Sequence, residues 1–143
     1  MSLEETKTIA RRHMDLLDQR NLEAARALYT ADARCHGFAP QSLDLNGYQQ
    51  TMSALLAAFP DSHFIVDDLI AEGDKVVIRH RLQGTHQGEF QGIPPTGKSV
   101  TVPAIGILRI VNDKIAETWL NADFLSLMHQ LGVVPPPAQA VSQ

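Results

Sequence analysis

The stretch Gly84–Lys98, GTHQGEFQGIPPTGK, decides how the rest of this chain folds. It lies between two runs rich in β-branched residues, VVIRHRLQ at 76–83 and SVTVPAIGILRIV at 99–111. Glycine and proline at this density stop both helices and strands, so the sequence predicts an ordered loop or bulged connection between two neighbouring strands. Any cavity that these strands border should lie near this loop.

The residues around this loop predict a sheet. Apolar and polar side chains alternate on both sides of a Gly73–Asp74 turn, and Asn112–Asp113 is a strong signal for a two-residue hairpin. In the strand that leads into the loop, His80 should point to the same side as its apolar neighbours, while Arg79 and Arg81 point to the other. The expected strands cover residues 63–71, 75–83, 99–111 and 114–120, with a shorter one at 33–38.

Other segments have the spacing of helices. In the clearest one, 46–59, apolar residues recur at helical spacing, Asn46 begins a capping box and Pro60 ends the helix. Asp123 can cap a short closing helix that Gly132 ends. The expected helices cover residues 4–20, 22–29, 46–59 and 124–131.

This order of elements indicates an α+β fold, in which a curved antiparallel sheet packs on three N-terminal helices and a short C-terminal helix. We expect one domain over residues 1–132, followed by a proline-rich tail at 133–143. A strongly bent sheet that packs on helices tends to leave an apolar, cone-shaped space in which a small molecule can bind.

The composition is that of a soluble globular protein, with 44% apolar and 20% charged residues in a chain of 143. A net charge of −4 without long runs of one sign argues against partners such as nucleic acid or an anionic membrane. The sequence has no apolar run near the ~20 residues of a membrane span, and its N-terminus lacks the apolar core of a signal peptide, so we expect a cytoplasmic protein. Cys35 is the single cysteine, which rules out an internal disulfide.

Several motifs in the second half of the chain resemble those of a known family. They are Gly84–Gly88, Gly92–Lys98, Arg109–Ile110, Asp113–Ile115, Glu117, Trp119, Asp123–Phe124 and Gln130–Gly132. With these motifs the chain resembles the cone-shaped α+β barrels of nuclear transport factor 2, ketosteroid isomerase and scytalone dehydratase. Within that superfamily it is most similar to the SnoaL-like polyketide cyclases.

The resemblance implies proton-transfer chemistry without a cofactor, which in that family closes a ring by an aldol reaction in an apolar pocket. A buried acid suits this task because burial raises the pKa of a carboxyl group towards neutrality. The position that matches the cyclase aspartate is Leu120, and the positions of its polar partners are Ala104 and Gly106. The resemblance therefore implies the scaffold without the usual catalytic groups. It also implies a homo-oligomer, either a dimer or a tetramer.

Three residues are candidates for the catalytic role. His80 should point inwards, where it is either a buried neutral imidazole with one partner or a general acid or base. His36, at the end of the first short strand, has the same two interpretations, with Cys35 facing the other way. Asp123 is either a pocket carboxylate or a helix cap, and a helix N-terminus favours its ionised form.

The candidate substrate-binding residues form an apolar wall. Ala104 and Gly106 either enlarge a pocket or admit a neighbouring helix, and Trp119 is either a core residue or a flat surface for a substrate. Thr118 and Leu120 should share one face of the last strand and Trp119 the other. The full set is Leu17, Cys35, Met52, Ala104, Gly106, Thr118, Trp119 and Leu120.

The remaining histidines have no predicted role in catalysis. His86 should fix the loop by hydrogen bonding, while His13, His63 and His129 look peripheral. The sequence contains no histidine pair with HxH or HxxxH spacing and no histidine cluster with acidic residues, so we expect no metal.

Three functions fit these observations. The first is a cofactor-free enzyme that cyclises, isomerises or hydrates an apolar carbonyl compound. The second is a binding protein for an apolar small molecule, which the loss of polar groups at Ala104, Gly106 and Leu120 favours. The third is a dimerisation module that uses the outer face of the sheet. A histidine or carboxylate within ~3.2 Å of a space for a substrate oxygen would favour the enzyme.

Overall fold

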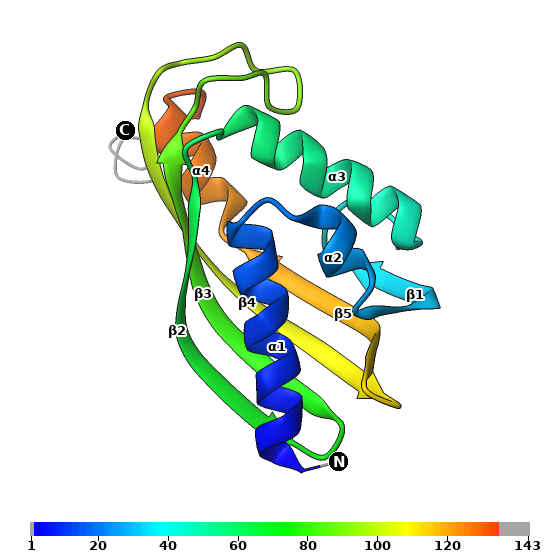
Figure 1. Ribbon diagram of the computed structural model, residues 1–143. Coiled ribbons are helices and arrows are strands. Elements are labelled where there is room, and N and C mark those ends of the chain that lie inside the picture. Colours follow the sequence, from blue (N-terminus) through cyan, green and yellow to red (C-terminus); the bar gives the residue numbers. More distant parts are fainter. Residues whose placement is uncertain (1, 135–143) are drawn as a thin grey trace.

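The computed structural model describes residues 2–134, in which four helices and five strands form a mixed α+β fold (Figure 1). From position 135 on, the expected proline-rich tail lies outside the described residues. In chain order the elements are α1 (Leu3–Asp18), α2 (Leu22–Arg26), β1 (Tyr29–His36), α3 (Leu45–Ala58), β2 (His63–Glu72), β3 (Lys75–Thr85), β4 (Ser99–Val111), β5 (Lys114–Ala122) and α4 (Phe124–Leu131).

The strands form one curved, open sheet in the order β1-β5-β4-β3-β2 (Figure 1). β2 to β5 make the expected antiparallel meander, in which Gly106 lies opposite Ile78 on one side and Leu120 on the other. β1 instead pairs with β5 in parallel, with His36 opposite Trp119. The expectation of a wholly antiparallel sheet was therefore wrong at this edge. Hairpin signals specify how successive strands pair, but they say nothing of the direction in which a distant strand returns.

The boundary between α2 and β1 also differs from the prediction. The helix expected over 22–29 ends at Arg26, and β1 begins at Tyr29. Tyr29 belongs to the sheet because its backbone pairs with Ile115 and its side chain is buried against the ring of His13. Tertiary contacts thus override the helical spacing of a short segment.

The cap of α3 lies two residues earlier than predicted. Its N-cap is Asp44, whose side chain accepts a hydrogen bond from the backbone N–H of Gly47 at 2.8 Å. The side chain of Asn46 instead accepts a hydrogen bond from the guanidinium group of Arg26 at 2.7 Å. This contact ties α2 to α3 and helps to set the direction in which α3 leaves the β1–α3 loop.

The two faces of the sheet differ in the way that the alternation in β3 predicts. Ile78, His80 and Leu82 are buried on one face, which we call the inner face because the helices cover it. Arg79 and Arg81 lie on the other face, the outer face, where they pair with carboxylates of β2. Figure 1 shows α1 lying across the curved sheet.

The β3–β4 loop, residues 86–98, is ordered and anchored at its base. The backbone N–H groups of Gln87 and Gly88 both donate to the carbonyl of Ala58, at 3.0 and 3.1 Å, so the loop satisfies a carbonyl at the end of α3. A Cβ at Gly88 would lie 2.5 Å from the carbonyl oxygen of Ala57, which explains the glycine. His86 is fully buried and its Nδ1 accepts a hydrogen bond from the backbone N–H of Thr96 at 3.2 Å, in line with the predicted role in fixing the loop.

Candidate active site

A cavity of about 350 Å³ lies between the inner face of the sheet and helices α1 and α3. This volume is within the range of roughly 300–1,000 Å³ that is usual for small-molecule sites. Four residues of its lining, Pro40, Ala54, Gln91 and Phe124, are exposed, so the cavity opens where the β1–α3 loop, α3, the β3–β4 loop and the start of α4 meet. Deeper inside, the wall is mainly apolar and includes Met14, Phe38, Leu55, Phe64, Phe90 and Leu108.

His80 brings an imidazole into this apolar wall from β3. Its side chain is directed to the inner face, as predicted, and the residue is only 8% exposed. Its Nδ1 is buried and has no hydrogen-bond partner among residues 2–134. Burial lowers the pKa of His80, while smaller effects of the Ile78 backbone and of Asp67 raise it. Since the net shift is downwards from 6.5, the imidazole is mainly neutral at pH 7 and has a lone pair for a proton.

His13 brings a second imidazole from α1, 4% exposed. Its Nε2 lies 2.8 Å from the hydroxyl of Tyr29 and 3.4 Å from that of Tyr48. Its Nδ1 is buried and, within the described part of the chain, contacts no hydrogen-bond partner. Burial, with a smaller effect of the charge on His80, lowers the pKa of His13 to about 4. The cavity therefore holds two neutral imidazoles, each with one nitrogen that lacks a partner among residues 2–134.

The predicted wall residues divide into two groups. Leu17, Met52, Gly106, Thr118 and Leu120 line the cavity.

Cys35, Ala104 and Trp119 are not among the residues that line the cavity. Cys35 is fully buried in the core, and burial raises the pKa of its thiol to about 12. Ala104 is buried on the inner face beside His80 but away from the cavity wall. Trp119 lies on the outer face because neighbouring residues of a strand point to opposite sides, and Thr118 points inwards.

Asp123 lies outside the cavity and caps α4. Its carboxylate accepts a hydrogen bond from the backbone N–H of Ser126 at 2.9 Å, and the residue is exposed. Asp123 is also not among the residues that line the cavity. The structure thus places this candidate in the capping role.

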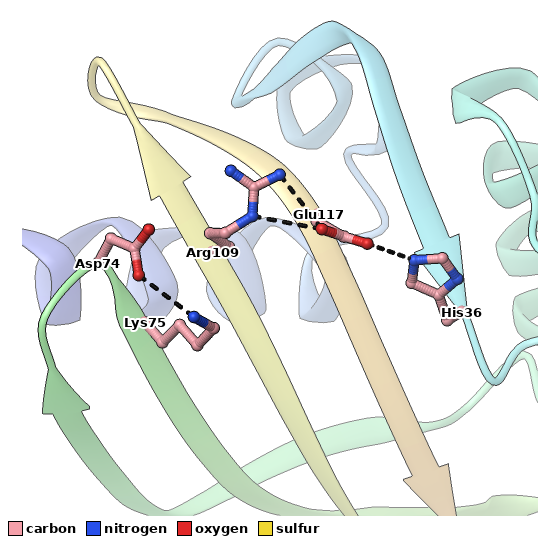
Figure 2. Close-up of polar contacts among 5 residues, drawn as sticks. All are labelled: His36, Asp74, Lys75, Arg109 and Glu117. Atoms are coloured by element: carbon pink, nitrogen blue, oxygen red, sulfur yellow. Dashed lines mark hydrogen bonds and ion pairs between the residues drawn. The ribbon is translucent and has the colours of Figure 1, made fainter.

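His36 also lies outside the cavity, in a cluster on the outer face that we call the His36 cluster. Its Nε2 is 2.6 Å from a carboxylate oxygen of Glu117, whose other oxygen accepts a hydrogen bond from Arg109 at 3.2 Å (Figure 2). Its Nδ1 is 2.6 Å from the hydroxyl of Ser42, and its ring stacks on Trp119 with centroids 5.6 Å apart. The hydrogen bond with His36, followed by the contacts with Arg109, lowers the pKa of Glu117. Both ring nitrogens of His36 are therefore engaged on the face opposite the cavity.

The described residues contain neither a metal-binding cluster nor a helix that could span a membrane. Residues 2–134 contain no group of three or more His, Cys, Asp or Glu side chains that could hold a metal ion. Over the same range, none of the helices has the length and hydropathy to cross a membrane.

The sequence reasoning missed His13 and Tyr48, and the expectation that His13 is peripheral was wrong. His13 follows Ala10 by three residues and precedes Leu17 by four, which places all three on one side of α1. Tyr48 is one of the apolar residues at helical spacing in α3, and that spacing predicts burial but no polar role in the site. The helical spacing around His13 was the available signal, and it would have indicated burial.

Comparison with known proteins supports this fold. The family model of the SnoaL-like polyketide cyclases matches residues 7–131. Among curated proteins, none matches the chain.

Several solved structures share the fold. AclR from Streptomyces galilaeus, described as a proposed hydroxylase, is 28% identical with a TM-score of 0.88, over 97% of this chain and 89% of AclR. IdmH from Streptomyces antibioticus, described as a proposed polyketide cyclase, is 29% identical with a TM-score of 0.79, over 89% of this chain and 98% of IdmH. A protein from Jannaschia sp., 24% identical, has a TM-score of 0.84 over 92% of this chain and 94% of its own.

These matches define the class of protein to which the chain belongs. The curved sheet packed on helices is the fold of the nuclear transport factor 2-like proteins. Since the family model covers most of the sequence, the chain belongs to the SnoaL-like polyketide cyclase family.

Proposed function

We propose that this protein is an enzyme that transfers protons on a carbonyl compound with a mainly apolar frame, bound in the cavity, and that it needs no cofactor. AclR and IdmH are described as catalysing different reactions, so family membership alone does not choose one. The observation that carries the proposal is His80, a neutral imidazole directed into an apolar cavity, with an Nδ1 that lacks a partner among residues 2–134.

The proposed chemistry begins with a proton on the carbon next to the carbonyl group. The lone pair of His80 accepts this proton, and the electron pair of the C–H bond forms an enolate. The imidazolium ion then returns the proton to carbon, which isomerises or exchanges the substrate. Alternatively, the enolate carbon attacks a second carbonyl and closes a ring, and the imidazolium ion gives its proton to the alkoxide that forms. A base whose pKa lies near or below the working pH suits the first step, because it is already deprotonated.

Leu120 supports the assignment of this role to a histidine. It lines the cavity at the position where the family resemblance places the cyclase aspartate. A leucine cannot transfer a proton, so an enzyme with this cavity needs a base on another element. His80 on β3 and His13 on α1 are the ionisable groups of the cavity lining whose pKa is lowered and which are therefore available as neutral bases.

The test is hydrogen–deuterium exchange at the carbon next to the carbonyl of 2-tetralone, a bicyclic ketone, followed by proton NMR in D₂O. We expect the wild-type protein to accelerate exchange, and His80→Ala to lower this rate by about 10²-fold or more. His63→Ala is the matched control, because His63 is exposed on β2 and pairs with Asp18 away from the cavity. An unchanged rate in His80→Ala would exclude His80 as the base. Wild-type protein that binds 2-tetralone without exchange would favour the non-catalytic binding protein.

We also propose that two copies of the chain pair through the outer face of the sheet. Strand register aligns Trp119, Ile107, Val77 and Ile70 in one row across β5, β4, β3 and β2. Ile70 is 62% exposed, and Ile105 beside the row is 49% exposed, which makes an apolar band on a sheet face. Sedimentation of wild-type protein and Ile105→Asp tests this: we expect a dimer that the aspartate dissociates, and a wild-type monomer at every concentration would exclude it.

A further inference from the structure

We infer that His13 is a second catalytic residue, which binds the substrate's carbonyl oxygen through its Nδ1–H, and that Tyr29 is the positioning residue that fixes the required tautomer. The inference deepens the proposed function and rests on it. It assigns separate tasks to the two imidazoles of the cavity: His80 accepts a proton from carbon, and His13 stabilises the oxygen on which the negative charge develops.

The Nε2 side of the His13 ring contacts Tyr29. Nε2 lies 2.8 Å from the hydroxyl of Tyr29, and the two rings meet edge to face with centroids 5.4 Å apart. The hydroxyl of Tyr48 is more distant from the same nitrogen, at 3.4 Å. All three residues are at most 6% exposed, so their polar atoms need hydrogen-bond partners close by.

The phenol protons of Tyr29 and Tyr48 determine the tautomer of His13. Burial raises the pKa of both phenols, so Tyr29 and Tyr48 keep their O–H groups. Besides the two phenol oxygens, Nε2 of His13 is the acceptor within reach. The arrangement that gives both phenol protons a destination makes Nε2 an acceptor, with Tyr29 as its donor. A neutral imidazole carries one N–H, and here that N–H must be at Nδ1.

The other ring nitrogen of His13 is Nδ1. It belongs to a residue that lines the cavity, and it is buried with no hydrogen-bond partner in residues 2–134. Buried N–H groups are almost always bonded, and leaving one open carries a free-energy cost. An oxygen of a bound molecule would satisfy it. Because burial lowers the pKa of His13 to about 4, the ring donates as a neutral imidazole and adds no positive charge to the cavity.

A neutral His13 limits the class of substrate that the cavity can bind. The cavity lining includes neither Lys nor Arg from the described part of the chain. An anionic carboxylate would therefore lose its hydration without gaining a cation. A neutral ketone or enone fits better, since its oxygen needs one donor and its neighbouring carbon needs one base. Preorganised donors of this kind act mainly on the charge that forms during the reaction.

Nitrogen-15 NMR of the imidazoles tests the tautomer in the wild-type protein. We expect His13 to carry its proton on Nδ1, whereas a proton on Nε2 would overturn the inference without any variant having to fold. Tyr29→Phe should leave a mixture of the two tautomers. Tyr48→Phe is the matched control, because its hydroxyl is farther from Nε2, and it should leave the Nδ1–H form dominant.

Binding of 2-tetralone labelled with carbon-13 at the carbonyl tests the role of the donor. The carbonyl signal should move downfield in the complex with wild-type protein and with His80→Ala, but not with His13→Phe. We expect His13→Phe to weaken binding of 2-tetralone roughly tenfold, and binding of tetralin, which lacks the oxygen, by less than about twofold. The exchange rate should fall by about 10²-fold. A downfield carbonyl signal that survives in folded His13→Phe would overturn the inference.

These outcomes separate the two proposals. One outcome is that the wild-type protein fails to exchange the protons of 2-tetralone while the carbonyl signal of the bound ketone still moves downfield in a way that depends on His13. In that case the proposed function fails and the oxygen site stands. If exchange depends on His80 but the carbonyl signal is the same in wild-type protein and in His13→Phe, the proposed function stands and this inference fails.

Discussion

The two faces of the sheet hold the same type of residue in opposite situations. On the inner face, His80 is buried in an apolar wall and, among the described residues, its Nδ1 has no partner. On the outer face, one ring nitrogen of His36 is engaged by Glu117 (Figure 2) and the other by Ser42. The satisfied histidine is held by its surroundings, and the unsatisfied one is available to a ligand. Residue type alone does not distinguish the two.

The difference follows from strand geometry together with the helices. Thr118 and Trp119 are neighbours in β5, yet one is directed to the cavity and the other to the His36 cluster. The inner face is closed by α1 and α3, so polar groups there lose water and their pKa values shift. The outer face stays polar enough for ion pairs between strands.

The largest expected contrast between the two faces is in packing. Ile115 is fully buried in the core between β5 and the helices, so Ile115→Ala should lower the free energy of unfolding by about 4 kcal/mol. Ile105→Ala on the outer face should change it by less than about 0.5 kcal/mol, measured where the chain is monomeric. Urea denaturation of both variants makes the comparison. Equal losses would contradict the assignment of inner and outer faces.

As the pH falls, the free energy of unfolding should first lose the contribution of the inner face. His13 has a pKa of about 4 in the folded protein and an ordinary value of 6.5, so the unfolded chain binds its proton earlier as the pH falls. Its stabilising contribution is complete above pH 6.5 and is lost towards pH 4, a change of roughly 3 kcal/mol. Glu117 has a lowered pKa, so its contribution is lost only below its ordinary value of 4.5.

Thermal or urea unfolding between pH 7 and pH 4.5 measures this acid effect. His13→Gln is the control: it should be less stable at pH 7 but lose less on acidification than the wild-type protein. Parallel pH curves for the two proteins would show that His13 is not the group responsible.

The smallest expected effect concerns the His36 cluster. His36→Ala removes a partly exposed hydrogen bond to Glu117, so it should lower the free energy of unfolding by about 1 kcal/mol. The same change uncovers Trp119, the single tryptophan, and should shift its fluorescence emission to the red. His129→Ala, in α4, is the control for the emission. An unchanged spectrum in His36→Ala would contradict the stacking.

Local sequence patterns predicted most of the fold. The alternation in β3 predicted the direction of His80, and the motifs around the β3–β4 loop predicted the family, which the family model confirms. The parallel pairing of β1 was missed because it depends on contacts far apart in the sequence.

The site was harder to predict, because a single residue step reverses the side to which a strand residue points. The predicted wall contained both Trp119 and Leu120, which one strand cannot direct to the same cavity. His13 was missed because its helical spacing with Ala10 and Leu17 indicates burial but does not distinguish a core residue from a residue of the site. Its contact with Tyr29 joins two elements that no local pattern connects.

The anchored base of the β3–β4 loop has a consequence for variation in loop length. Gln87 and Gly88 are bonded to the end of α3, so an insertion there would break a helix–loop contact. At the tip, a Cβ added to Gly92 would meet no atom within 4 Å, and the neighbouring Gln91 is exposed at the opening of the cavity. Both residues have positive φ and lie between Phe90 and Ile93, whose backbones bond to each other, so a change of length at the tip would open this tight turn. The segment that decides the fold therefore also forms part of the opening of the cavity.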